Sequence, residues 1–202
     1  TFCWVPMKIA HLSNNSHISA TFGPFMLFRR AAYEAIGGYA AVRSNTLDDF
    51  ELGRIIKRRG LRWMLFVGVN WVRILPYKGN IDAFRGVSRS IFPALYYRVS
   101  LFVLLLTVVL GLGLLPLFTL AIGVISYPEE KDNLFVSLAL IGLVAIPWFI
   151  VCKKFQHSLL IVSLYPLSIV LMAVVASHSL VTYSFGSTHW KGRKVIGQKA
   201  RF

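Results

Sequence analysis

Two long runs without a charged side chain constrain the fold of this chain most. Residues 99–125 contain no Asp, Glu, Lys or Arg, and residues 134–151 form a second uncharged run. A helix needs about 20 apolar residues to cross the hydrocarbon core of a bilayer. The first run can cross with tilt, and the second has about the minimum spanning length. Because 56% of the chain is hydrophobic, we expect a membrane protein.

A third apolar stretch, residues 158–185, complicates the topology. It is less uniformly apolar than the other two, because it contains Pro166, Ser168, Ser177 and His178. Three full crossings would place the basic tail, residues 186–202, across the membrane from the residues before 99. We therefore predict two or three hydrophobic helices over 99–185, with one segment re-entrant or interfacial. The sequence does not indicate which segment this is.

Positive charge is concentrated at the two ends of the chain. The net charge is +14, although residues 99–185 hold as many acidic as basic side chains. By the positive-inside rule, residues 1–98, the loop at Lys153 and the tail belong in the cytoplasm. The arginines do not follow the pattern of a DNA- or RNA-binding module, so we expect the lipid bilayer and no nucleic acid as a partner.

Residues 80–98 have the pattern of a basic amphipathic helix just before the first apolar run. Arg85 and Arg89 point away from the apolar positions, and Pro93 is expected to kink the helix. We predict that this helix lies along the membrane interface with its apolar face in lipid. The alternative is a helix packed on the preceding domain.

A second helix is predicted to begin at Asp48 or Asp49 and to end at Gly60. Asp48 and Glu51 have the spacing of a capping box. Asp49 falls in the first turn, where the positive end of the helix dipole should keep the pKa of its carboxyl low. Such an aspartate suits a general base, and the alternative is that both aspartates only cap the helix.

The rest of residues 1–79 predicts a small α/β domain. Gly23 begins a turn, and Phe25–Phe28 should be a buried strand. A short helix over 30–36 should end at Gly37 and Gly38, which allow positive φ and a chain reversal. Further strands are expected at residues 1–5, 61–67 and 71–74.

Several of these pieces resemble one enzyme family in residue type, order and spacing. They are Gly23–Arg30, Ala32–Tyr39, and Asp48–Leu52 followed by Lys57 and Gly60. Together they resemble the acceptor-side half of family 2 glycosyltransferases. Phe84–Arg89 and Trp190–Arg193 fit the membrane-bound, lipid-modifying members, which include ceramide glucosyltransferase-like, hopanoid-associated and carotenoid-acid glycosyltransferases.

The resemblance implies part of a GT-A catalytic domain over 1–79, followed by the membrane region. It places the catalytic base at Asp49, with Asp48 beside it. Residues that would bind the donor diphosphate or the acceptor are Gly23, Arg29, Gly37, Gly38, Arg85, Arg89, Trp190 and Arg193. The implied reaction is inverting transfer from a nucleotide sugar to a lipid hydroxyl or carboxyl. A divalent cation, Mg or Mn, is expected as cofactor, and we expect a bacterial inner membrane as the location.

The chain departs from this family at two points. Arg85 and Arg89 are four residues apart, and Ser90 stands where many relatives have tryptophan. The nucleotide-binding half with its metal-binding Asp-x-Asp has no counterpart, so we expect a C-terminal fragment that is inactive alone and lacks most of the metal ligands. The alternative function is a non-catalytic membrane scaffold or partner subunit with a basic cytoplasmic domain.

Overall fold

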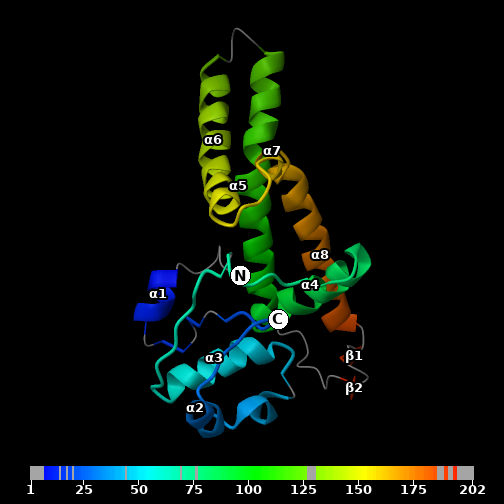
Figure 1. The fold of residues 1–202 in the computed structure, drawn as a ribbon. Helices are drawn as coiled ribbons and strands as arrows, with labels where there is room; N and C mark the ends of the chain where they lie inside the picture. Colours follow the sequence, from blue (N-terminus) through cyan, green and yellow to red (C-terminus); the bar gives the residue numbers. More distant parts are fainter. Residues whose placement is uncertain are drawn as a thin grey trace.

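The computed structural model describes residues 7–185 except 14, 17, 20, 44, 69, 76 and 127–130, together with 189–190 and 193–194. Figure 1 shows long helices standing over a smaller group of short helices. The short helices come first in the chain, and the long helices form its second half.

Three helices are long and apolar enough to cross a membrane. They are α5 (Val99–Ile125), α6 (Lys131–Lys154) and α8 (Tyr165–Phe185). Many of their large apolar side chains face outward, Leu104 and Phe118 among them, and this suits helices surrounded by lipid. The predicted integral membrane protein is confirmed.

Helices α5 and α6 form an antiparallel pair in close contact. The Ser137 hydroxyl of α6 donates a hydrogen bond to Thr119 Oγ1 of α5 at 2.8 Å. A Cβ atom added to Gly123 would lie 3.2 Å from the backbone nitrogen of Leu134, so the two backbones approach closely at this end. Small residues permit such an approach between membrane helices.

Helix α8 also runs antiparallel to α5, which places its end on the side where α5 begins. Gly113 of α5 faces Ile169 near the start of α8, while Phe102 and Tyr183 meet in one buried cluster near its end. Helices α6 and α8 therefore run in the same direction, and the connection between them, which contains α7 (Leu160–Ser163), returns along the bundle (Figure 1). The end of α8 thus lies on the side where α5 begins.

Helix α4 (Asn80–Ala94) packs against α8. Ser88 Oγ lies 2.8 Å from His178 Nδ1, and the Ser179 hydroxyl accepts a hydrogen bond from the Phe92 N–H at 3.1 Å. Phe92 is fully buried in an aromatic cluster with Tyr97, Phe102 and Tyr183. A membrane helix therefore covers the Phe92 side of α4, while the predicted position of this helix along the membrane interface stays a prediction.

The α4 to α5 turn is held in an unusual backbone conformation. Tyr96 and Tyr97 both have positive φ, 56° and 60°. Bulky residues rarely adopt this region, so surrounding contacts must hold it in place. The Tyr97 ring packs in the aromatic cluster, and the Arg54 guanidinium of α3 lies 5.5 Å from the centre of the Tyr96 ring.

The first part of the chain contains α1 (Met7–Leu12), α2 (Arg30–Ala35), the 3-10 helix η1 (Gly38–Val42) and α3 (Asp48–Arg58). Its core is formed by apolar side chains of η1, α3 and the residue after α2, namely Ile36, Val42, Leu52 and Ile56. The Lys57 ammonium donates hydrogen bonds to the carbonyls of Ala10, Ser13, Asn15 and Ile18, which ties the segment after α1 to α3. The predicted helices at 30–36 and 48–60 are confirmed, each within two residues.

The predicted α/β fold is wrong. Phe25–Phe28, residues 61–67 and residues 71–74 form no strand, and no strand in the described part of the chain exceeds two residues. The pair β1 (His189–Trp190) and β2 (Arg193–Lys194) is antiparallel. Strand propensity needs neighbouring strands to yield a sheet, and the described segments find none. The strand expected at residues 1–5 lies outside the described residues.

Candidate functional site

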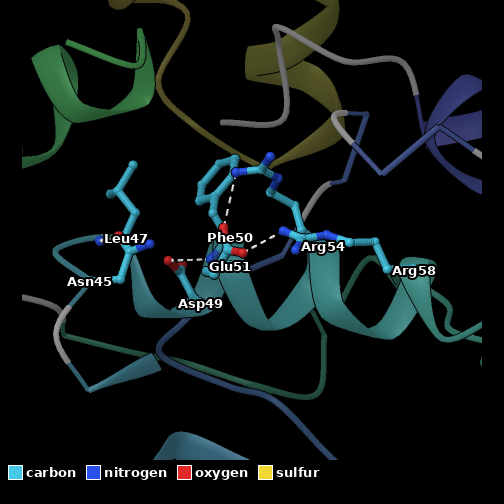
Figure 2. A network of polar contacts seen from close by, with 7 residues as sticks. All are labelled: Asn45, Leu47, Asp49, Phe50, Glu51, Arg54 and Arg58. Atoms are coloured by element: carbon cyan, nitrogen blue, oxygen red, sulfur yellow. Dashed lines mark hydrogen bonds and ion pairs between the residues drawn. The ribbon is translucent and has the colours of Figure 1, made fainter. Parts of the chain in front are cut away.

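Both carboxylate oxygens of Asp49 are fixed by backbone amides at the start of α3. Oδ2 accepts a hydrogen bond from the Gly23 N–H at 2.9 Å, and Oδ1 accepts one from the Phe50 N–H at 2.8 Å. Figure 2 shows the second contact in the first turn of α3. Asp48 lies beside it and accepts the Asp49 N–H at 3.0 Å. Gly23 and Asp49, which are 26 positions apart in sequence, thus form one small site.

The predicted capping box does not form. Leu47, not an aspartate, occupies the N-cap position, and no side chain caps the helix there. Glu51 instead forms ion pairs with Arg54 at 2.9 Å and Arg58 at 2.5 Å, as Figure 2 shows. Side chains three or four residues apart lie on the same face of a helix. Glu51 therefore pairs with Arg54, and it also reaches Arg58, instead of capping the helix start.

The pKa of the Asp49 carboxyl is raised above its ordinary value, which corrects the expectation of a low pKa. Burial is the main cause, and the negative charge of Asp48 adds to it. The hydrogen bonds from Phe50 and Gly23 act in the opposite direction and offset part of the effect. Desolvation of the charged form therefore outweighs the donors at the helix start.

Gly23 has no space for a side chain. An added Cβ would lie 2.9 Å from Asp49 Oδ2 and 3.2 Å from Asp49 Cγ. Close approach to a carboxylate is the situation in which a missing side chain is required. The predicted site residue Gly23 therefore contacts the predicted base directly.

Gly37 and Gly38 form the chain reversal that the sequence predicts. Their φ angles are 77° and 55°, and the Tyr33 ring lies where a Gly38 side chain would be. The reversal presents Tyr39, whose N–H donates to the Tyr33 hydroxyl at 3.0 Å and whose hydroxyl contacts Met26 Sδ at 3.7 Å. The two glycines thus form the reversal before Tyr39, and their role in binding stays a prediction.

Tyr39 is a further candidate for the site, and the sequence analysis did not select it. The pKa of its phenol is raised, first by burial and then by the charges of Asp48 and Asp49. The direct contacts of Tyr39 are with Tyr33 and Met26, so the aspartates act on it through their charge. The Gly-Gly-Tyr triplet in the resembling segment was the available signal.

Of the arginines selected from the sequence, Arg89 is the one whose pKa responds to the charge of Asp48. Burial lowers the pKa of its guanidinium, while the charge of Asp48 is among the groups that oppose this. Its backbone carbonyl accepts a hydrogen bond from the Tyr183 hydroxyl of α8 at 2.9 Å. Arg85 and Arg29 are exposed, and no contact in the described part of the chain joins either of them to Asp49.

Trp190 and Arg193 are partners across the β1 to β2 pair. This pair follows the end of α8 (Figure 1). Their roles in binding stay predictions.

The described residues do not fit a divalent cation. Within them, no group of three or more His, Cys, Asp or Glu side chains could hold a metal ion. Asp48 and Asp49 alone supply too few ligands for the octahedral oxygen sites that Mg²⁺ prefers. The expected Mg or Mn cofactor stays a prediction, and no chemistry is assigned to it on these residues.

Comparison with known proteins gives one match. A family model described as Glycosyl transferase family 21 matches residues 4–195. No curated protein and no solved structure matches the chain. The matched range includes Asp48 and Asp49, Arg85 and Arg89, all three long helices and both short strands.

Proposed function

The chain belongs to glycosyl transferase family 21, and from this membership we propose that it transfers a sugar from a nucleotide-sugar donor to a membrane lipid, with Asp49 as the general base. The observation that carries the proposal is the position of Asp49. Its two oxygens are fixed by backbone N–H groups, and its helix lies against the turn that leads into the first membrane helix. The reactive carboxylate is thereby held beside the bilayer.

The electrostatics of Asp49 support the role of a base. A carboxylate with a raised pKa holds a proton more strongly than an ordinary aspartate, and general bases work best when their pKa approaches the operating pH. The fixed oxygens need no reorganisation when the proton arrives. Asp48 strengthens this base through its negative charge.

The reaction is a single displacement. Asp49 takes the proton of the acceptor hydroxyl, and the acceptor oxygen forms a bond to the anomeric carbon of the donor. The bond from that carbon to the diphosphate oxygen breaks, and the nucleoside diphosphate leaves with the electron pair. Attack opposite the leaving group inverts the anomeric configuration.

The join between α3 and the membrane helices supports a lipid as the acceptor. Arg54 of α3 lies over the ring of Tyr96 in the turn between α4 and α5, and Asp48 influences Arg89 of α4 electrostatically. An acceptor anchored in the bilayer can therefore present its polar end at α3 without leaving the membrane. We place the aspartates, the α8 end and the tail in the cytoplasm, as the positive-inside rule requires.

The arginines of α4 are the proposed contacts to the donor diphosphate. One guanidinium group can donate two parallel hydrogen bonds to phosphate oxygens, and it keeps its charge when it is partly buried. Arg89 is the stronger candidate because it is partly buried and its pKa responds to the charge of Asp48, whereas Arg85 is exposed on the same helix.

The test uses the full-length protein in isolated membranes and a panel of radiolabelled nucleotide sugars. Label that enters the lipid extract with one donor, and stays in the aqueous phase in membranes lacking the protein, would support the proposal. No label in lipid with any donor, from protein that is correctly inserted, would contradict it. That result would favour the alternative of a non-catalytic scaffold or partner subunit.

A further inference from the structure

The segment between α3 and α4 presents an exposed apolar surface. Met64 is 64% exposed, Phe66 75%, Trp71 90% and Leu75 85%. We call these residues, with Val67 and Ile74 between them, the 64–75 surface. Large apolar side chains seldom gather on a surface that faces water. Such a patch usually marks a site that contacts a membrane or another molecule.

The opposite side of this segment is firmly attached to α3. Leu61 and Trp63 pack against the core that contains Leu52 and Ile56. The Leu65 N–H donates a hydrogen bond to His11 Nε2 at 2.9 Å, and the His11 ring meets the Trp63 ring edge to face. The exposed side chains are thus held outward by a segment anchored on its inner side.

The segment reaches the level at which a membrane helix ends. The Gln156 side-chain amide donates a hydrogen bond to Asn70 Oδ1 at 3.3 Å, and Gln156 lies two residues beyond the end of α6. Lys153 and Lys154 in the last turn of α6 are exposed. Lysines at such a position extend to lipid headgroups, so Asn70 and Trp71 lie near headgroup depth. Figure 1 shows the trace climbing from α3 toward the membrane helices before it enters α4.

The charge of the segment matches an anionic membrane surface. Residues 61–79 contain Arg62, Arg73 and Lys78 and no acidic residue. Basic residues near a membrane are attracted to anionic headgroups, and tryptophan is enriched at the interface because its ring is apolar and its N–H is polar.

We propose that the 64–75 surface lies in the headgroup region of an anionic bilayer, as a membrane contact separate from the three apolar helices. The inner side of the segment is attached to α3, so this membrane contact keeps α3 close to the membrane. This inference does not depend on the transferase activity.

The experiment measures depth at Trp71. The full chain with Cys3→Ala and Cys152→Ala carries one new cysteine, Trp71→Cys, labelled with an environment-sensitive fluorophore. It is reconstituted in phosphatidylcholine vesicles containing phosphatidylglycerol. The control is Arg30→Cys, an equally exposed position in α2, which Figure 1 shows at the end of the molecule remote from the long helices. Quenching is measured with a nitroxide on the lipid chain near the headgroup and with aqueous acrylamide.

The proposal expects the Trp71 label to shift to shorter emission wavelength and to lose intensity with nitroxide lipid. The Arg30 label should respond to acrylamide alone. A Trp71 label quenched by acrylamide as strongly as the Arg30 label would overturn the proposal, because the surface would then face water. Protection from both quenchers would overturn it as well, since a polypeptide would then cover the surface.

Discussion

The Gly23 N–H donates to Oδ2 of Asp49 at 2.9 Å, and a Cβ atom on Gly23 would lie at that same distance from the oxygen. The absence of a side chain at Gly23 leaves the space that this hydrogen bond needs. The position of the carboxylate therefore depends on a residue that carries no chemistry of its own.

Gly23→Ala should move the Asp49 carboxylate by a few tenths of an ångström and lower kcat about tenfold to a hundredfold, because misplaced catalytic groups lose rate steeply. The matched control is Gly79→Ala, where an added Cβ meets nothing within 4 Å. Initial rates of lipid labelling at saturating donor check this. Equal rates for the two variants would show that the Gly23 contact is unimportant.

The acid limb of the pH profile should lie above the pH expected of an ordinary aspartate, because burial raises the pKa of Asp49. Asp48 repels the ionised form of Asp49, so Asp48→Asn should lower that pKa and move the limb to lower pH. The measurement is kcat/KM against pH for both proteins. A limb that stays in place or moves upward would contradict the proposed base.

Tyr183→Phe should destabilise the protein by about 1–3 kcal/mol, because the Tyr183 hydroxyl satisfies the Arg89 carbonyl. Within a helix this carbonyl would accept from residue 93, but Pro93 has no N–H. In the Pro93→Ala background the same Tyr183→Phe change should cost less. Thermal unfolding in detergent of the four proteins in this cycle checks it, and equal costs in both backgrounds would rule out this explanation.

Gly113→Val should loosen α5 from α8 and cost about 1–3 kcal/mol, because an added Cβ would lie 2.3 Å from Ile169 Cδ1. Gly111→Val, two residues away, has open space and should change stability by less than about 0.5 kcal/mol. Thermal unfolding of both variants in one detergent makes the comparison. Similar losses would mean that α8 does not pack at Gly113.

Local patterns in the sequence predicted the local structure well. The acidic residues before Leu52 and the arginines after it predicted a helix, and the uncharged runs predicted membrane helices. Both patterns could be read from the sequence because they depend only on residues close together in the chain. The double glycine likewise predicted the reversal before Tyr39. The glycosyltransferase resemblance is confirmed at the level of the enzyme class, although the matching family is family 21 and the lipid-modifying subtype stays a prediction.

Features that depend on distant partners could not be predicted in the same way. The Phe92 side of α4 is covered by α8, and the Asp49 pKa depends on burial, which no local motif encodes. Strand formers at residues 61–67 need neighbouring strands, so their composition alone gave the wrong fold. The parallel course of α6 and α8 is likewise a tertiary relationship, and the re-entrant or interfacial segment among the three apolar stretches stays a prediction.

The most direct test of the central claim is lipid labelling by Asp49→Asn in the assay that identifies the donor. Asp132→Asn, an exposed aspartate in the first turn of α6, is the control for loss of a helix-start charge. We predict a loss of about 10²- to 10⁴-fold for Asp49→Asn with unchanged membrane insertion, and full activity for Asp132→Asn. Substantial transfer by Asp49→Asn would contradict Asp49 as the base.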